Sequence, residues 1–241
     1  MSATTLSALV VWHDVECGSY RADLPLWLEL AAAERGPVLD VGAGTGRVAL
    51  ALARAGHDVV ALDREPALLD ALARRAAGLR VETVAADAGG FDLGRRFGLA
   101  IVPMQTIQLL PARAGFLASA RRHLERGGLL AIAISGALEA FGELDGELLP
   151  DPDVGTAGGW RFESQPTAVR ALPHATRIER VRRAVSPEGA LSEEDDTLEL
   201  AHVTVAELEA EGRAAGFAPE PARHIEATAE HVGAEVVLLR A

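Results

Sequence analysis

The sequence is poor in cysteine, in basic residues and in long apolar runs, and each shortage excludes a class of protein. One cysteine, Cys17, cannot build an internal disulfide framework or a cysteine-based metal cluster. The 23 basic residues are all arginines and face 35 acidic residues, which gives a formal net charge of −12. Because nucleic-acid binding rests on a basic footprint, we expect no nucleic-acid partner.

No stretch approaches the ~20 consecutive apolar residues of a membrane-spanning helix. The short apolar run at residues 9–12 lacks the basic region and the cleavage site of a signal peptide. We therefore expect a soluble cytoplasmic protein with no membrane partner. A hydrophobic content of 49% over 241 residues suits one globular α/β domain with additional structure at one end.

Residues 38–46, Val-Leu-Asp-Val-Gly-Ala-Gly-Thr-Gly, form the most informative stretch. A short apolar run predicts a buried strand, and alternating glycines then lead into a strongly helix-forming segment, residues 47–56. Glycine allows the backbone to bend sharply and to approach a ligand, and a helix that begins there directs free N–H groups at it. The dinucleotide fingerprint G-x-G-x-x-G would need glycine at Arg47, whereas the spacing here is G-x-G-x-G after the acid Asp40. Alternatively, the glycine turn could bind no ligand and serve only to pack the strand closely against the helix.

Strands and helices alternate through residues 24–135. Asp23 is expected to cap the first helix, and residues 1–19 are expected to be irregular. We expect helices at 24–31, 45–55, 67–77 and 111–126, and strands at 37–41, 57–62, 79–85, 97–103 and 129–135. This alternation predicts a parallel sheet with helices on both faces.

Residues 136–160 are rich in acidic residues, glycine and proline, so we expect a loop or a partial lid. Three β-like stretches at 160–170, 176–185 and 197–203 are expected to pair antiparallel. Thr204 and Glu207 form a capping box for a helix that runs to residue 215. Residues 234–239 are predicted to be the last strand.

Acidic residues follow two of the predicted strands, where ligands of open α/β sheets bind. Asp63 lies 21 positions after Gly42 and could accept both hydroxyls of a ribose, or could cap the next helix. Arg64 beside it could stack on an adenine edge or be solvated. Asp87, in Val-Ala-Ala-Asp-Ala, could bind an adenine or be an ordinary turn residue.

Together these segments resemble the class I S-adenosylmethionine-dependent methyltransferases, in particular a bacterial small-molecule branch. Residues 38–46 resemble the family's motif I, residues 84–88 its adenine-binding acid, and residues 101–110 its motif IV region. Residues 20–27 and 122–130 also resemble family segments, with Arg126 where proline is common. The resemblance implies a Rossmann-like doubly wound sheet of order 3-2-1-4-5-7-6 with strand 7 antiparallel, plus an antiparallel insertion after strand 5.

The resemblance further implies a single methyltransferase domain over residues 1–241. It would consist of an N-terminal helical cap (1–35), a cofactor-binding core (36–135), a loop and antiparallel substrate cover (136–203), and a last helix with strands (204–241). The implied cofactor is S-adenosyl-L-methionine, with S-adenosyl-L-homocysteine as product and no metal. The implied cofactor contacts are Tyr20, Asp40, Gly42, Ala43, Gly44, Gly46, Asp63, Arg64, Asp87, Ala88, Pro103, Met104 and Gln105.

The expected reaction is in-line methyl transfer to a small-molecule acceptor, driven mainly by proximity and orientation. The chain lacks the Asn/Asp-Pro-Pro-Tyr or -Phe motif of enzymes that methylate DNA bases or protein glutamines. No catalytic base is predicted; His202 is a weak candidate, and a core or edge histidine is the stronger interpretation. Trp160 and the acidic segment 139–153 could attract a cationic amine, although a solvated acidic loop is the simpler reading.

Two other functions stay open from the sequence. The first is a non-catalytic S-adenosylmethionine-binding or scaffold protein of the same fold. The second is an NAD(P)-dependent oxidoreductase, against which Arg47 and the acid before the glycines argue. The acceptor, the methylated atom and the oligomeric state are left undetermined, with a homodimer among the options.

Overall fold

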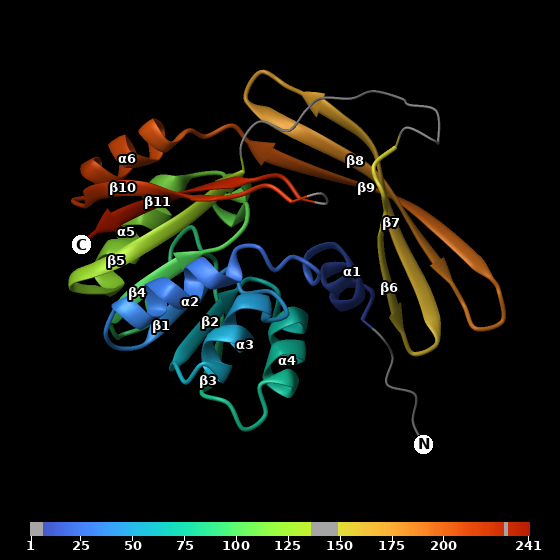
Figure 1. Ribbon diagram of the computed structural model, residues 1–241, viewed down its shortest axis with the longest axis horizontal. Helices are drawn as coiled ribbons and strands as arrows, with labels where there is room; N and C mark the ends of the chain where they lie inside the picture. Colours follow the sequence, from blue (N-terminus) through green and yellow to red (C-terminus); the bar gives the residue numbers. More distant parts are fainter. Residues whose placement is uncertain (1–6, 136–148, 229–230) are drawn as a thin grey trace. The chain divides into compact units, whose positions relative to one another are not determined.

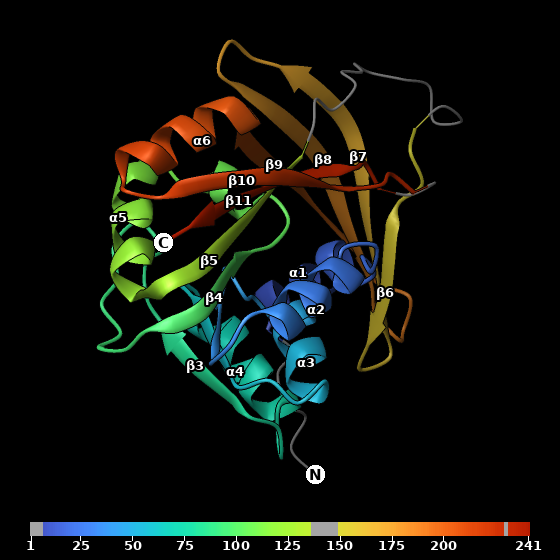
Figure 2. The same cartoon turned by 60° about the vertical axis from the view of Figure 1, so that its left-hand side comes forward.

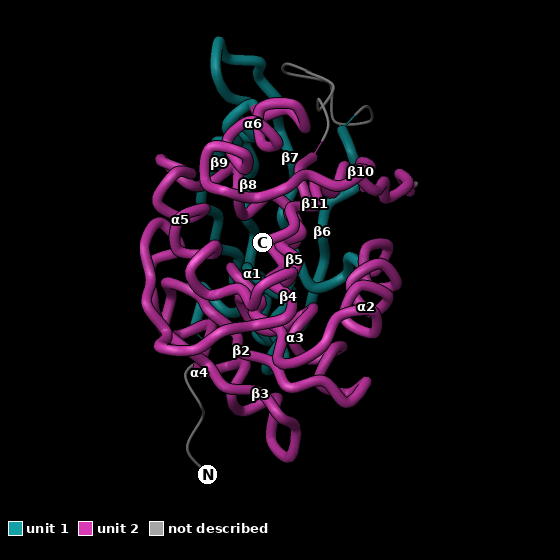
Figure 3. The backbone as a smooth tube through the Cα atoms, turned by 90° about the vertical axis from the view of Figure 1, so that its left-hand side faces the viewer, with its two compact units in different colours: residues 1–20, 137–202 teal, residues 21–136, 203–241 magenta. Residues whose placement is uncertain are grey.

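The computed structural model describes residues 7–135, 149–228 and 231–241 (Figure 1). The chain divides into two compact units, coloured separately in Figure 3. We call residues 21–136 and 203–241 the core unit, and residues 1–20 and 137–202 the insertion unit.

The core unit contains a seven-stranded sheet of order β10-β11-β5-β4-β1-β2-β3. β1, β2, β3, β4 and β5 are parallel, whereas β11 runs antiparallel to both β5 and β10. With β10 and β11 counted as strands 6 and 7, the order is 3-2-1-4-5-7-6, which confirms the predicted topology. The strands are β1 (Val38–Val41), β2 (Val59–Asp63), β3 (Val81–Ala85), β4 (Phe97–Val102), β5 (Leu124–Ser135), β10 (Ala218–Ile225) and β11 (Ala234–Arg240).

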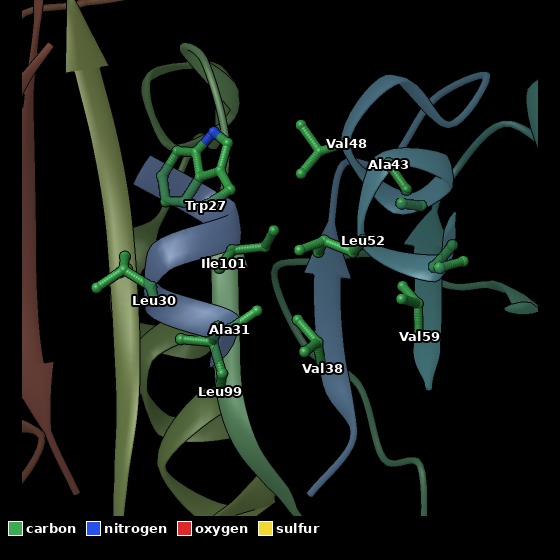
Figure 4. Packing of buried hydrophobic residues seen from close by; sticks show 14 of the residues in the cluster. Trp27, Leu30, Ala31, Val38, Ala43, Val48, Leu52, Val59, Leu99 and Ile101 are labelled. Atoms are coloured by element: carbon green, nitrogen blue, oxygen red, sulfur yellow. The ribbon is translucent and has the colours of Figure 1, made fainter. Parts of the chain in front are cut away.

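Helices cover both faces of this sheet (Figure 2). Apolar residues of one face pack with α2 (Leu24–Ala33), α3 (Arg47–Arg54) and α4 (Pro66–Arg75), and those of the other with α5 (Arg113–His123) and α6 (Val205–Ala214). Figure 4 shows part of the first cluster, in which Trp27 and Leu30 of α2 accompany Ile101 of β4 and Val38 of β1. All four residues of β1 are buried, as expected for a strand covered on both sides.

In the core unit, one predicted strand boundary is shifted and one predicted helix cap is confirmed. β5 begins at Leu124 rather than at residue 129, because Leu124 already pairs with Phe97 before a register shift. The capping box of α6 is confirmed: Glu207 N–H donates to Thr204 Oγ1, and the Glu207 carboxylate accepts from Thr204 N–H.

The insertion unit contains an antiparallel sheet of order β6-β7-β8-β9 and the helix α1 (Ala8–Cys17). Its strands are β6 (Asp153–Ala157), β7 (Trp160–Ala171), β8 (Ala175–Val185) and β9 (Leu191–Ala201). Trp12 of α1 meets Phe162 of β7 edge to face, with ring centroids 5.3 Å apart. The predicted antiparallel pairing is thus confirmed, with β9 beginning earlier than expected.

Two predictions for the insertion unit are wrong. Residues 8–17 form a helix although they were expected to be irregular, because Val11, Trp12 and Val15 are buried against β6 and β7 and stabilise it by tertiary packing. Residues 153–157 form a strand inside the segment expected to be a loop, because they pair with residues 160–164. Residues 136–148 of the predicted acidic loop lie outside the described residues.

Among the described residues, no helix has the length and apolar character needed to cross a membrane.

Candidate functional site

The turn between β1 and α3 is built on three glycines in left-handed conformations. The φ angles of Gly42, Gly44 and Gly46 are 74°, 55° and 96°. A Cβ added to Gly42 would lie 2.5 Å from Cγ2 of Thr106, in the 3₁₀ helix η1 (Thr106–Leu109) that follows β4. Gly42 and Ala43 also donate their N–H groups to the carbonyl of Leu62, at 2.8 and 3.0 Å. Glycine is therefore required sterically, and the turn is packed against the ends of both neighbouring strands.

Asp40 lies in β1 immediately before this turn and is paired in register with Ala61 on one side and Ile101 on the other. It is 1% exposed. Neither of its carboxylate oxygens has a hydrogen-bond partner of good geometry among the residues that the structure describes, although the backbone N–H of Ala49 lies near enough to lower the pKa of Asp40. Burial raises the pKa of Asp40 from 3.8 to about 7, and the positive charge of Arg47 opposes this rise. An unpaired buried carboxylate is costly, so it points to a site that a cation or a donor completes.

Arg47, the first residue of α3, is held by the segment that precedes α2. Its Nη1 and Nη2 donate to Oδ1 and Oδ2 of Asp23 at 2.5 and 2.7 Å. Trp27 Nε1 donates to the same Oδ2 at 2.8 Å. Asp23 occupies the N-cap position of α2, as predicted, but its side chain makes no capping bond to the helix. The carboxylate instead forms the ion pair with Arg47 and accepts from Trp27.

Asp63 ends β2 and holds the glycine turn. Its Oδ2 accepts the N–H of Gly44 at 2.8 Å, and its Oδ1 accepts the N–H of Glu65, just before α4, at 3.0 Å. Each carboxylate oxygen can accept a further hydrogen bond, so these contacts are compatible with a ribose as well as with a role at the start of α4. Arg64 beside it is 79% exposed and lies 3.4 Å from the Glu65 carboxylate.

The end of β3 lies next to the end of β2, since Ala86 N–H donates to the carbonyl of Asp63 at 3.0 Å. Asp87 is exposed, and its Oδ1 accepts the N–H of Gly89 at 2.7 Å. That bond is typical of a turn aspartate. Ala88 is half-buried.

The segment after β4 contains a backbone outlier. Met104 has φ 54°, and among the described residues it alone has a positive φ without being glycine. Such a conformation costs about 1–2 kcal/mol and is typical of functional loops. Pro103 is buried and Gln105 half-buried. Thr106 Oγ1 donates to the carbonyl of Pro103 at 3.1 Å, which braces the loop that Gly42 contacts.

A buried amide ties this loop to the end of β5. Gln108 Oε1 accepts from the N–H and from the hydroxyl of Ser135, at 2.9 and 3.1 Å. Sequence reasoning missed Gln108, Thr106 and the Asp23–Arg47 pair. No local signal marks them, because each acts through a partner far away in the sequence.

Tyr20, which the resemblance implied, and His202, the weak candidate for a catalytic base, lie in the insertion unit. Tyr20 is 7% exposed. His202 is exposed, and its Nε2 lies 3.0 Å from Oγ1 of Thr176. Trp160 stacks on Phe162, with centroids 6.4 Å apart. Within the described part of the chain, no group of three or more metal-ligating side chains is present.

Residues 38–128, from the start of β1 to Gly128, match the family model described as "Methyltransferase domain". Over these residues the chain is similar to a methyltransferase domain. This segment contains the glycine turn, Asp40, Asp63, Asp87 and the loop after β4. The core unit has the Rossmann-like fold of class I methyltransferases that the resemblance implied.

Solved structures with the same fold include methyltransferases of bacterial origin. CalS10, an S-adenosylmethionine-bound amino pentose methyltransferase from Micromonospora echinaspora, is 22% identical with a TM-score of 0.72, and the match covers 100% of both chains. The sugar N-methyltransferase KedS8 from a Streptoalloteichus species is 20% identical with a TM-score of 0.72, covering 100% of this chain and 96% of that one. DesVI from Streptomyces venezuelae is 21% identical with a TM-score of 0.69, covering 94% of each chain. At such identities the likeness establishes the fold. No curated protein gives a significant match to the sequence.

Proposed function

We propose that the protein transfers a methyl group from S-adenosyl-L-methionine to a small-molecule acceptor. The observation that carries this proposal is the unpartnered, buried carboxylate of Asp40 beneath the glycine turn of a methyltransferase domain. The methionine end of the cofactor is cationic, and a buried carboxylate gains most from a cationic partner. The cofactor therefore fits the residues present.

Each strand end has a proposed part in holding the cofactor. The backbone of Gly42, Ala43, Gly44 and Gly46 would lie against it, and Asp63 would accept the ribose hydroxyls on its remaining lone pairs. Asp87 and Ala88 would contact the adenine, with Arg64 at its edge. Pro103, Met104 and Gln105 would contact the methionine part, together with Tyr20. The strained Met104 supports a role for this loop, since backbone strain clusters at ligand sites.

When bound, S-adenosylmethionine supplies an already activated methyl group. The chain then has to hold the acceptor in line with that group and exclude water. A general base is needed only if the acceptor must lose a proton. His202 stays a weak candidate for one, because its ring is exposed and engaged with Thr176.

An amine on a small molecule is the acceptor that the comparisons support. KedS8 is described as a sugar N-methyltransferase and CalS10 as an amino pentose methyltransferase. We further propose that residues 1–241 act as one methyltransferase domain in which residues 136–203 contribute to acceptor recognition. An acidic segment that favours a cationic amine would be consistent with this.

Calorimetric titration with S-adenosylmethionine, S-adenosylhomocysteine, NAD⁺ and NADPH tests the proposal. We expect both adenosyl ligands to bind and both nicotinamide nucleotides to fail. If neither S-adenosylmethionine nor S-adenosylhomocysteine binds at high micromolar concentration, the proposal is wrong. Binding of both without S-adenosylhomocysteine formation across a broad panel of amine, hydroxyl and thiol acceptors would favour the non-catalytic alternative.

A further inference from the structure

Arg47 is a buried arginine at a position where its charge does not help the helix. Its side chain is 7% exposed, and that of its partner Asp23 is 1% exposed. The N-terminus of a helix favours acidic residues, and α3 has none in its first turn. A buried ion pair is often no more stabilising than apolar residues of similar volume. Helix stability therefore does not explain why a charge stands here.

The ion pair is rigidly held and links two elements of the core unit. The two terminal nitrogens of the Arg47 guanidinium donate to the two carboxylate oxygens of Asp23, 24 residues earlier in the chain. Trp27, whose ring is completely buried in the cluster of Figure 4, donates to the same carboxylate. This bidentate arrangement fixes the position of the positive charge.

The charges around Asp40 come from several elements. Arg47 of α3 lowers its pKa, whereas the carboxylates of Asp23 and of Asp63, at the end of β2, raise it. From α4, Arg75 Nη1 reaches the carbonyl of Thr45 in the glycine turn at 3.4 Å. Asp23 and Arg47 neutralise each other, so the buried group retains one net negative charge when Asp40 is ionised. Without Arg47, burial and the repulsion from Asp23 and Asp63 would raise the pKa of Asp40 further, and a neutral carboxyl group cannot form an ion pair.

We propose that Arg47 is a positioning residue of the cofactor site: held by Asp23 and Trp27 at the start of α3, at the other end of the glycine turn from Asp40, it supports the buried Asp40 carboxylate in pairing with a cationic ligand. The identity of that ligand rests on the proposed function, whereas the ionisation of Asp40 in the ligand-free protein is independent of it.

Carbon-13 NMR of the aspartate carboxyl groups in the ligand-free protein measures this ionisation directly. The Asp40 resonance is assigned by its absence from D40N, and its titration is followed in wild type, D23N and the double variant D23N/R47M. The two variants differ only in Arg47, and in both an amide oxygen at position 23 can still accept from Trp27. Arg47→Met alone would leave Asp23 buried and unpaired, whereas in D23N the amide oxygen at position 23 can still accept from Arg47. Circular dichroism verifies that both variants are folded before they are titrated.

We expect the Asp40 midpoint near pH 7 in wild type. We expect it to fall in D23N, because a neighbouring negative charge is removed, and to be higher in D23N/R47M than in D23N by about one pH unit or more. The same midpoint in D23N and D23N/R47M would overturn the proposal.

Calorimetry with S-adenosylhomocysteine at a pH below both midpoints gives the second readout. We expect D23N/R47M to bind about tenfold more weakly than D23N there, because one pH unit between the midpoints is then a tenfold difference in the ionised fraction of Asp40. A raised midpoint with equal affinities would overturn the claim that Asp40 pairs with the ligand. If the wild type itself fails to bind, the proposed function falls, while the titration series still decides the role of Arg47.

Discussion

The substitution Asp40→Asn should become more favourable for the stability of the ligand-free protein as the pH rises. The quantity that should increase is the unfolding free energy of D40N minus that of wild type. In the wild type, burial raises the pKa of Asp40 from 3.8 to about 7. Between these values the folded protein retains a proton that the unfolded chain has lost, so stability falls as pH rises through this window. The stabilisation that the folded protein gains by binding the Asp40 proton more tightly is fully present below pH 3.8 and is lost above about pH 7.

The size of the effect follows from the same window. Each pKa unit is worth about 1.4 kcal/mol, so the cost of ionising Asp40 should grow by about 3 kcal/mol between pH 5 and pH 8. Asparagine at this position cannot ionise, and although its buried amide costs about 1–3 kcal/mol, that cost does not depend on pH. The difference in unfolding free energy between D40N and wild type should therefore move by about 3 kcal/mol in favour of D40N over this range.

Urea unfolding of both proteins at four pH values from 5 to 8 measures the difference, in which the other titrating groups cancel. D40L serves as a second variant, since it removes both the charge and the amide and should follow the same pH dependence as D40N. A difference in unfolding free energy that stays constant from pH 5 to 8 would contradict a raised pKa of Asp40. It would show that Asp40 ionises in the folded protein as it does in the unfolded chain.

Two further variants test the strand ends. Gly42→Ala should cost about 3 kcal/mol or more in urea unfolding, through the left-handed φ and the contact with Thr106, whereas Gly56→Ala, with φ 98° and open space, should cost only the backbone part of about 1–2 kcal/mol. Equal costs would contradict the packing of this turn against the loop after β4. Asp63→Ala should weaken S-adenosylhomocysteine binding at least about tenfold in calorimetry. An unchanged affinity would remove the ribose role.

The core unit could be predicted because its signals are local. Apolar runs such as residues 38–41 and the glycines and prolines between elements mark strands, turns and helix starts within a few residues. The resemblance then supplied the sheet order, which local patterns do not contain. The carboxylates at the strand ends were identifiable from their position after each apolar run.

The missed features depend on partners distant in sequence. α1 is stabilised by Trp12 against Phe162, and β6 by pairing with β7, so neither can be recognised from its own residues. Asp23 has the spacing of a helix cap, but its carboxylate binds Arg47. The bond between Asp63 and the Gly44 N–H likewise appears only when β2 lies beside the glycine turn.

A crystal structure of the protein with S-adenosylhomocysteine would show whether Asp40 and Asp63 bind the cofactor. We predict the ligand at the carboxyl ends of β1, β2 and β4, with its amino group paired to Asp40 and its ribose hydroxyls on Asp63. A ligand bound elsewhere, or one that leaves the Asp40 carboxylate without a partner, would contradict this prediction.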